Sequence, residues 1–429
     1  MQNKRFTIST WGLIMIVLGS TIGSGIFSTP SAIASEASSE KWIYIVWFIG
    51  GFISISGAII FAKLAQEFKG AGGIYLYLKQ AYGNAVAFLY GWCTLTVITS
   101  GAVAAITIVA VDYINVFYTL TSKQSLLLGS CIILFHGLVH SRGVKVGELF
   151  INILSGAKFI GLIIIIVSGL FLLPEATAAP NYAIDYTPSI GSISIALVAV
   201  LWSFSGFQHV SFLAGETESS GRSVAKAMVI GTIIVTAIYL FINYALIRVL
   251  GLESLISSEK PVADALSIGS AAAGKLVTIL VIISTFGAGF VFTMSAPRIY
   301  EEMGNDGVFF KFLSKRHSRY HTPANAIMTQ TIWSILLLCF WGTFKALITY
   351  STFLDWVFLG MAGFSALFLL NRTALSLVHR IATVVFSIAV LFFLGAVLIE
   401  GPEQAYYGLG LLLIGLIVYY LFRKKTPAN

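Results

Sequence analysis

Residues Leu18–Pro30, LGSTIGSGIFSTP, interrupt the first long apolar stretch of the chain. Glycine and small hydroxyl residues weaken a helix at the depth where a membrane segment must satisfy its own backbone. Gly19 and Gly23 alone could be a close helix-packing pair. The run Gly23-Ser24-Gly25 extends beyond one helix face, however, and irregular backbone at that depth is tolerated only inside protein or beside a cavity. The stretch therefore predicts a broken helix that lines a cavity.

The chain around this stretch has the composition of an integral membrane protein. Of its 429 residues, 57% are hydrophobic and only 10% are charged, which leaves too little polar surface to coat a soluble globule. A helix needs about 20 mostly apolar residues to cross a bilayer. We count twelve such stretches, the fourth of which is short for a full crossing. The predicted spans are 10–34, 42–62, 85–112, 125–139, 150–173, 192–215, 226–250, 275–297, 325–345, 347–370, 381–398 and 405–421.

The placement of basic residues predicts the orientation of these spans. A net charge of +8 could indicate nucleic-acid binding in a soluble protein, but here the charges are sorted by side. With the amino terminus in the cytoplasm, 19 of the 26 Lys and Arg residues fall on the cytoplasmic side, six fall on the other side, and Lys158 falls within a span. The positive-inside rule then puts both termini in the cytoplasm. We expect a multi-pass protein of the cell inner (plasma) membrane with no nucleic-acid partner.

A second interrupted helix is expected five helices after the first, because transporters built from inverted repeats carry matching broken helices in their two halves. Residues Leu201–Glu216, LWSFSGFQHVSFLAGE, meet this expectation. They place Ser203, Ser205, Gly206 and Gln208 in an otherwise apolar helix. Small residues at either site alone could serve packing. Their occurrence in spans one and six together indicates a transporter.

Unwound helix segments expose backbone groups that suit a zwitterion. We expect the amides of Ser24, Gly25 and Ile26, near the positive end of a half-helix, to bind a carboxylate. Free carbonyls close by would bind an ammonium group, and an α-amino acid carries both groups at a fixed separation. The carbonyls expected to do so belong to Thr21, Ile22, Trp202, Ser203 and Ser205, and Gly23 and Gly206 complete the predicted substrate-binding segments.

Four segments resemble those of the amino acid–polyamine–organocation (APC) transporter superfamily. GSTIGSGIF resembles its helix-1 signature, and GGIYLYLKQAYG (Gly72–Gly83) is similar to its first cytoplasmic loop. The segments Ser284–Phe309 and His321–Ile327 resemble its helix 8 and the start of its helix 9. The match runs in order from about Phe6 to Arg372, so the motifs support one another.

The resemblance implies an all-α integral membrane fold with 12 transmembrane helices of the LeuT type, in which helices 1 and 6 are broken. The two inverted five-helix repeats would be residues 10–173 and 192–370, followed by helices 11 and 12 at about 381–421. The whole chain, 1–429, would then be a single transporter domain for amino acids or related amines.

Two segments carry more specific resemblances. LWSFSG resembles helix 6 of bacterial arginine/agmatine antiporters, in which the aromatic residue matching Trp202 closes over the substrate as an outer gate. Those antiporters have a glutamate where this chain has Gln208, which argues against acid-resistance antiport. LSGAKFIGLIIII (Leu154–Ile166) resembles helix 5 of L-type amino acid transporters. In that group the lysine matching Lys158 occupies the space that holds a sodium ion in sodium-coupled relatives.

Lys158 lies about two turns inside its predicted span. Its amine could reach the cytoplasmic interface by snorkelling, although an intramembrane charge is a functional candidate by default. It could tether the broken part of helix 1 to helix 8 through backbone carbonyls and a hydroxyl such as Ser284. It could instead load and release a proton. Both functional roles predict sodium independence.

Asp355 is the only acidic residue that we place well inside a span. With Gln208, it forms a possible polar site that pairs with a cationic substrate or relays protons. The alternative is a structural hydrogen-bond partner that faces the outer vestibule near Lys345 or Arg248. His209 is expected to be a hydrogen-bonded polar residue at the helix-6 interface.

Other reactive side chains predict no second chemistry. Cys93, Cys131 and Cys339 fall within predicted spans and are expected to serve packing and not disulfides. His136 and His140 are four residues apart, a metal-compatible spacing, but no nearby ligand completes a set. We expect them on a helix face at the cytoplasmic end, with no metal and no cofactor. The absence of convergent acid, base or phosphate-binding groups argues against an enzyme.

The expected function is sodium-independent exchange of small neutral amino acids by alternating access. The central segments offer small hydroxyls and apolar groups without a certain carboxylate, which favours neutral substrates. Proton symport and cationic amino acid or polyamine antiport stay open, and a channel would need repeated charged pore positions. The loop 113–124 has no cysteine, whereas animal L-type transporters use one there for a disulfide to an accessory glycoprotein. No such partner is expected.

Overall fold

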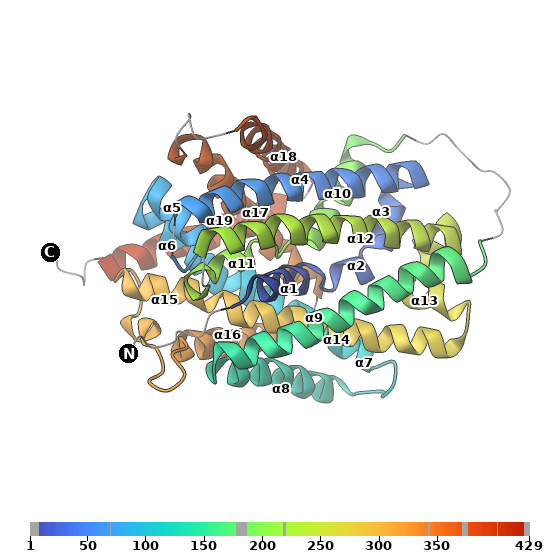
Figure 1. Cartoon of the computed structure of the whole chain (residues 1–429), viewed down its shortest axis with the longest axis horizontal. Coiled ribbons are helices and arrows are strands. Elements are labelled where there is room, and N and C mark those ends of the chain that lie inside the picture. Colours follow the sequence, from blue (N-terminus) through green and yellow to red (C-terminus); the bar gives the residue numbers. More distant parts are fainter. Residues whose placement is uncertain are drawn as a thin grey trace.

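The computed structural model describes residues 8–68, 70–176, 187–217, 220–341, 344–370, 376–400 and 402–423. Within these ranges the regular structure is helical, and the single β-type contact is an isolated parallel bridge between Ile8 and Thr217. Most long helices run along the long axis of the molecule, and the short α2 lies among them in the middle of the bundle (Figure 1). The predicted all-α class is confirmed.

Ten stretches of the described chain are long and apolar enough to cross a membrane. Two shorter apolar helices, 324–340 and 406–422, cover the ninth and twelfth predicted spans. The protein is therefore a multi-pass membrane protein. The helices of these stretches are α1 (Thr10–Thr21), α2 (Gly25–Ser28), α4 (Glu40–Glu67), α6 (Asn84–Cys93), α7 (Thr99–Ile114), α8 (Ser122–Ser141), α9 (Val144–Val167), α10 (Ile190–Phe204), α11 (His209–Phe212), α12 (Ser220–Ser257), α14 (Ala271–Ser295), α15 (Pro297–Asn305), α16 (Ala324–Trp341), α17 (Phe344–Leu369), α18 (Leu377–Glu400) and α19 (Pro402–Arg423).

The helix of the fourth span, α8, has 20 residues, so the expectation of a short fourth span was wrong.

Short elements connect the helices of the spans. Three further helices lie between the spans, and π-helical and 3₁₀ turns occur within or beside them. They are α3 (Pro30–Ala37), α5 (Ile74–Tyr82), α13 (Pro261–Ser267), the π-helical η1 (Thr94–Ile98) and η2 (Ser168–Leu172), and the 3₁₀ turns η3 (Ala214–Glu216) and η4 (Lys311–Ser314).

Both predicted helix interruptions are present. The first helix stops at Thr21 and resumes as α2 at Gly25. The sixth stops at Phe204 and resumes as α11 at His209. Gly206, in the second gap, has a φ of 123°, a backbone conformation that favours glycine. The small residues that signalled the breaks thus coincide with the non-helical backbone.

The two histidines, His136 and His140, lie toward the C-terminal end of α8, on a helix face that is buried. His136 and His140 are 1% and 2% exposed. Aromatic side chains of α14 cover them, with ring centroids 4.5 Å apart for His136 and Phe286 and 4.0 Å apart for His140 and Phe290. No group of three or more potential metal-ligating residues occurs in the described chain. These histidines pack between helices α8 and α14.

The cysteines differ from one another in their surroundings. Cys93 is buried, as expected of a packing residue, whereas Cys131 and Cys339 are exposed on the surface of the bundle. The packing role predicted for the last two was therefore wrong, because their helix faces point away from the core. All three are free thiols.

Candidate functional site

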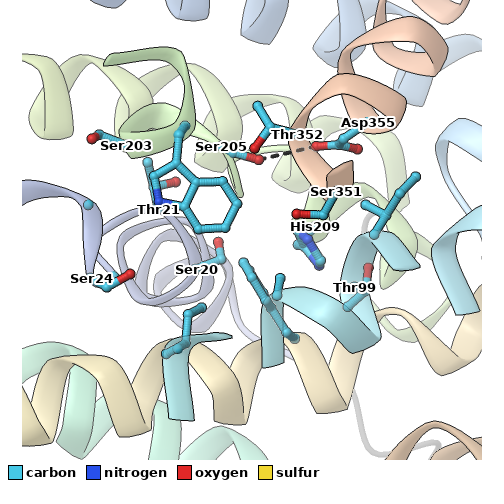
Figure 2. A pocket seen from close by; sticks show the side chains of 17 residues that line it. Ser20, Thr21, Ser24, Thr99, Ser203, Ser205, His209, Ser351, Thr352 and Asp355 are labelled. Carbon is cyan, nitrogen blue, oxygen red and sulfur yellow. Dashed lines mark hydrogen bonds between the residues drawn. The ribbon is translucent and has the colours of Figure 1, made fainter. Parts of the chain in front are cut away.

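A central cavity lies where the two interrupted helices meet. Its unfilled space of about 500 Å³ includes the opening to solvent, and η1, α7, α14 and α17 complete its wall. Figure 2 shows hydroxyl groups from several helices around it. The predicted residues that line it are Thr21, Gly23, Ser24, Gly25, Trp202, Ser203, Ser205 and Asp355. His209, which was predicted only at a helix interface, also lines the cavity. The lining residues that were not predicted are Ser20, Ile98, Thr99, Ala102, Ile106, Phe292, Ser351 and Thr352.

Six predicted site residues lie behind the cavity wall. Ile22 and Lys158 belong to a polar contact between α1 and α9, which Ser284 of α14 joins. Gly206 and Gln208 support the second break through a hydrogen bond of 3.0 Å from the Gly206 amide to Gln208 Oε1. Ile26 is fully buried behind the cavity wall. Of the lining residues that were missed, only the hydroxyl residues offered a sequence signal, as polar side chains within apolar spans.

The two breaks pack directly against each other. Ser20 Oγ donates a hydrogen bond of 2.9 Å to the Gly206 carbonyl. A Cβ atom on Gly25 would lie 2.7 Å from Ser203 Cα, so the backbones of α2 and α10 approach too closely for any larger residue there. Two interruptions that are joined by a contact across 186 residues of the chain therefore form one structural unit.

A tyrosine on α12 bridges this unit. The Tyr239 hydroxyl lies 2.9 Å from the Thr21 carbonyl and 3.0 Å from the Ser203 carbonyl, one from each interrupted helix. Tyr239 is fully buried. Its hydroxyl satisfies carbonyl groups that lost their helical partners where the helices stop.

Several donors in the first break have no acceptor. The amides of Ser24, Gly25 and Ile26 donate to no acceptor in the described part of the chain. The hydroxyls of Ser24 and Thr21 are also buried without a hydrogen-bond partner among those residues. Buried donors without partners are costly. This edge of the cavity is therefore suited to an anionic group.

Four of the five carbonyls expected to bind an ammonium group are already occupied. The Thr21 and Ser203 carbonyls accept from Tyr239, and the Trp202 carbonyl accepts from the Ser205 amide at 3.0 Å. The Ile22 carbonyl accepts from Lys158. Within the described ranges, the cavity-lining residues Ser20 and Ser205 keep carbonyls to which no donor is bonded. The expectation of free carbonyls at the other four positions was wrong, because side chains of neighbouring helices or the local turn fill them.

Lys158 lies behind the first break and joins three helices. Its Nζ atom donates to the carbonyls of Gly19, Ile22 and Ser284 at 2.9, 2.8 and 3.1 Å, and its side chain is 1% exposed. An ammonium group has three donor hydrogens, so all are used. The predicted tether included a bond between Lys158 and the Ser284 hydroxyl. That hydroxyl instead donates to the Ile22 carbonyl at 3.1 Å. Lys158 therefore does not snorkel to the membrane surface.

Asp355 of α17 faces the cavity. Its Oδ2 atom accepts hydrogen bonds of 3.2 Å from Ser205 Oγ and 3.2 Å from Gln208 Nε2. Arg248, one of the neighbours expected for it, instead pairs with Glu175 at 3.1 Å, and the side chain of Lys345 lies outside the described residues. The expected position near Arg248 was wrong, because the α17 face that carries Asp355 turns toward the second break.

His209 forms the next part of the cavity wall. Its Nδ1 atom lies 2.6 Å from Ser295 Oγ, and its ring stacks on Phe292 with centroids 4.3 Å apart. These contacts fit the predicted role of a hydrogen-bonded residue at the helix interface. They also orient the ring beside the cavity.

Buried ion pairs close the end of the bundle beyond α11. Arg298 of α15 pairs with Glu216 of η3 at 3.0 Å, with the two side chains 1% and 7% exposed. Nearby, Asp306 accepts from Lys79 at 2.6 Å and from the Tyr75 hydroxyl at 2.7 Å. Burial, and then the hydrogen bond to Asp306, raise the pKa of Tyr75. These contacts hold α5 and η3 against α15 and the loop that follows it.

The fold and site together define a polytopic membrane protein with two interrupted helices around a polar central cavity. The model of the amino acid permease family matches residues 8–420. The chain therefore belongs to the amino acid permease family, which confirms the resemblance predicted from its motifs. Members of this family are transporters, so the expectation that the chain is not an enzyme is also confirmed.

Individual relatives match most of the chain or nearly all of it. The human b(0,+)-type amino acid transporter 1 is 30% identical over 425 residues, which cover 95% of this chain and 86% of that protein. The serine/threonine exchanger SteT of Bacillus subtilis (strain 168) is 27% identical over 426 residues, which cover 97% and 96%. The human large neutral amino acids transporter small subunit 2 is 28% identical over 364 residues, which cover 81% and 66%.

Proposed function

We propose that this protein is a sodium-independent exchanger of small neutral amino acids that works by alternating access. The contact between the two breaks supports a LeuT-type arrangement with repeats at about 10–173 and 192–370 and helices 11 and 12 at 381–421. Broken helices that meet at a central site are the expected device of such transporters. The Bacillus subtilis relative, named as a serine/threonine exchanger, agrees with small substrates and with exchange.

The unsatisfied backbone groups support a specific substrate position. The α-carboxylate binds the free amides of Ser24, Gly25 and Ile26, with the Ser24 hydroxyl as a further donor. The α-ammonium group binds the free carbonyls of Ser20 and Ser205. The other carbonyls predicted for this role already accept hydrogen bonds from donors of the protein. Both charged groups of an amino acid would then replace missing internal hydrogen bonds.

Trp202 is the proposed outer gate. It belongs to the last turn of α10, lines the cavity and packs against the cluster that includes Ala102, Ile106 and Phe292. A ring that moves at the end of an interrupted helix could cover the substrate before the two repeats rock against each other.

The position of Lys158 is the observation that carries the proposal. Its ammonium group bonds two carbonyls of the first break and one of α14. A fixed positive charge there removes the need for a metal cation between these helices. Because all three donor hydrogens are engaged, we favour a static tether over a proton carrier.

The proposed orientation places both termini in the cytoplasm of a cell with an inner (plasma) membrane. The first described residue, Ile8, bonds the Glu216 carbonyl at 2.8 Å, and Glu216 pairs with α15. Phe422, near the other end, packs on Phe309 just after α15, with ring centroids 5.3 Å apart. Both ends thus lie on one side of the bundle, the side rich in basic residues. The 113–124 loop lacks cysteine, so we propose that no disulfide-linked subunit is needed.

The test is uptake of labelled serine by proteoliposomes that contain the purified protein. We expect unlabelled amino acid inside the vesicles to stimulate uptake strongly, and replacement of sodium by potassium to have no effect. Accumulation driven by a proton gradient in vesicles without internal amino acid would instead establish a symporter. A requirement for sodium would refute the role given to Lys158.

A further inference from the structure

We infer that Asp355 selects the substrate side chain and that the central cavity accepts basic amino acids in addition to small neutral ones. This inference rests on the proposed amino acid transport and adds a second substrate class to the same site. Neutral substrates were expected because the two interrupted segments carry no certain carboxylate. The structure places the Asp355 carboxylate in the cavity wall.

The hydrogen bonding of Asp355 leaves one oxygen open. Ser205 and Gln208 both donate to Oδ2. No donor in the described part of the chain reaches Oδ1. Two neutral donors on one oxygen fix the orientation of the carboxylate but do not compensate a buried negative charge. A substrate cation would supply both the missing donor and the missing charge.

No basic side chain of the described ranges forms an ion pair with Asp355. Lys158 donates its three ammonium hydrogens to the carbonyls of Gly19, Ile22 and Ser284. Arg248 and Arg298 are paired with Glu175 and Glu216. His209 lines the same cavity, but its Nδ1 atom is bonded to Ser295. The carboxylate therefore faces the cavity without a protein counter-charge in that part of the chain.

The cavity also has the two-ended layout that a basic amino acid requires. Figure 2 shows Ser24, beside the free amides, and Asp355 on opposite sides of the lining residues, with Thr21 and Ser205 between them. An α-carboxylate at the Ser24 side directs the side chain toward Asp355. Ala102, Ile106 and Phe292 add an apolar wall to the same cavity, a surface of the kind that the methylene stem of lysine or arginine requires.

The first experiment uses the unaltered protein. Proteoliposomes loaded with serine take up labelled serine in the presence of excess lysine, arginine or putrescine outside. We expect lysine and arginine to inhibit, and internal lysine to replace internal serine as the exchanged substrate. Putrescine, which carries amines but no carboxylate, is expected not to inhibit, and inhibition equal to that of lysine would contradict the two-ended position.

The second experiment removes the charge and keeps the shape. In Asp355→Asn we expect the ratio of lysine uptake to serine uptake to fall by about tenfold or more, because the substrate cation loses its buried partner. Asp112→Asn is the matched control, since it makes the same change at an exposed position of α7. An unchanged ratio in Asp355→Asn would overturn the assignment of the selector.

The outcomes separate this inference from the function on which it rests. If serine is exchanged but neither lysine nor arginine competes with it in the unaltered protein, the second substrate class is refuted and neutral exchange stands. If lysine is exchanged and serine is not, the neutral specificity fails while the role of Asp355 is supported. If neither amino acid is exchanged, both proposals fall.

Discussion

The ammonium group of Lys158 lies 2.8 Å from the carbonyl oxygen of Ile22, in the gap between α1 and α2. A helix that stops inside a membrane leaves carbonyls without partners. Lys158 satisfies two of them, and its bond to the Ser284 carbonyl ties the gap to α14. One buried charge thus stabilises the irregular backbone beside the cavity.

Lys158→Ala is expected to abolish serine exchange and to lower the stability of the protein. The change removes this donor from three buried carbonyls, of which the Ile22 carbonyl keeps the Ser284 hydroxyl. Each carbonyl left unsatisfied costs about 1–3 kcal/mol. The apparent melting temperature in detergent and the exchange rate in proteoliposomes measure the two effects. Lys275→Ala is a control at an exposed position near the start of α14. Normal exchange by Lys158→Ala would exclude an essential tether.

Tyr239→Phe tests the bridge between the two breaks without changing side-chain size appreciably. We expect slower exchange and a loss of about 1–3 kcal/mol in stability, because the Thr21 and Ser203 carbonyls lose a shared donor. Tyr244→Phe makes the same change on the same helix at a side chain that is 50% exposed, and it should have little effect. Equal behaviour of the two variants would show that the bridge does not matter.

Sequence and structure agree on where the helices break and differ on which groups the breaks leave free. Gly23-Ser24-Gly25 and Ser205-Gly206 could be recognised because small residues are costly in a membrane helix unless a cavity or a close contact requires them. Whether the carbonyls at the breaks are free could not be recognised from residue type. Their occupation depends on Tyr239 and Lys158, which reach them from helices far away in the chain.

Asp355 illustrates the same limit. Its type and depth could be predicted from the sequence, since an acid within a span is rare. Its partner Ser205 is 150 residues away, and only the packing of α17 against the second break brings them together. The aliphatic wall residues Ile98, Ala102 and Ile106 could not be distinguished from ordinary lipid-facing or core residues, because they carry no polar signal.

Gly25→Ala is expected to abolish exchange. The added Cβ would lie 2.7 Å from Ser203 Cα, a backbone atom that cannot move away alone, so the two interrupted helices would separate. Gly156→Ala is a closely matched control, because no atom lies within 4 Å of the position that its Cβ would take. We expect Gly156→Ala to exchange serine normally, and to be slightly stabilised by its better helix propensity. Serine uptake at matched protein levels compares the two variants, and full activity in Gly25→Ala would refute the close approach.

Glu216→Gln tests the buried ion pair at the end of the bundle. The change leaves the Arg298 guanidinium, 1% exposed, without its counter-charge, and breaking a buried pair in this way costs about 3–5 kcal/mol. We expect a large fall in melting temperature, because the contact between η3 and α15 is weakened. Glu67→Gln, which breaks the more exposed Lys63 pair, should cost less than about 1 kcal/mol. Adding Arg298→Met to Glu216→Gln removes the unpaired charge as well, and should restore much of the stability. If the double variant melts no higher than Glu216→Gln, the loss comes from packing, and the uncompensated charge is not its cause.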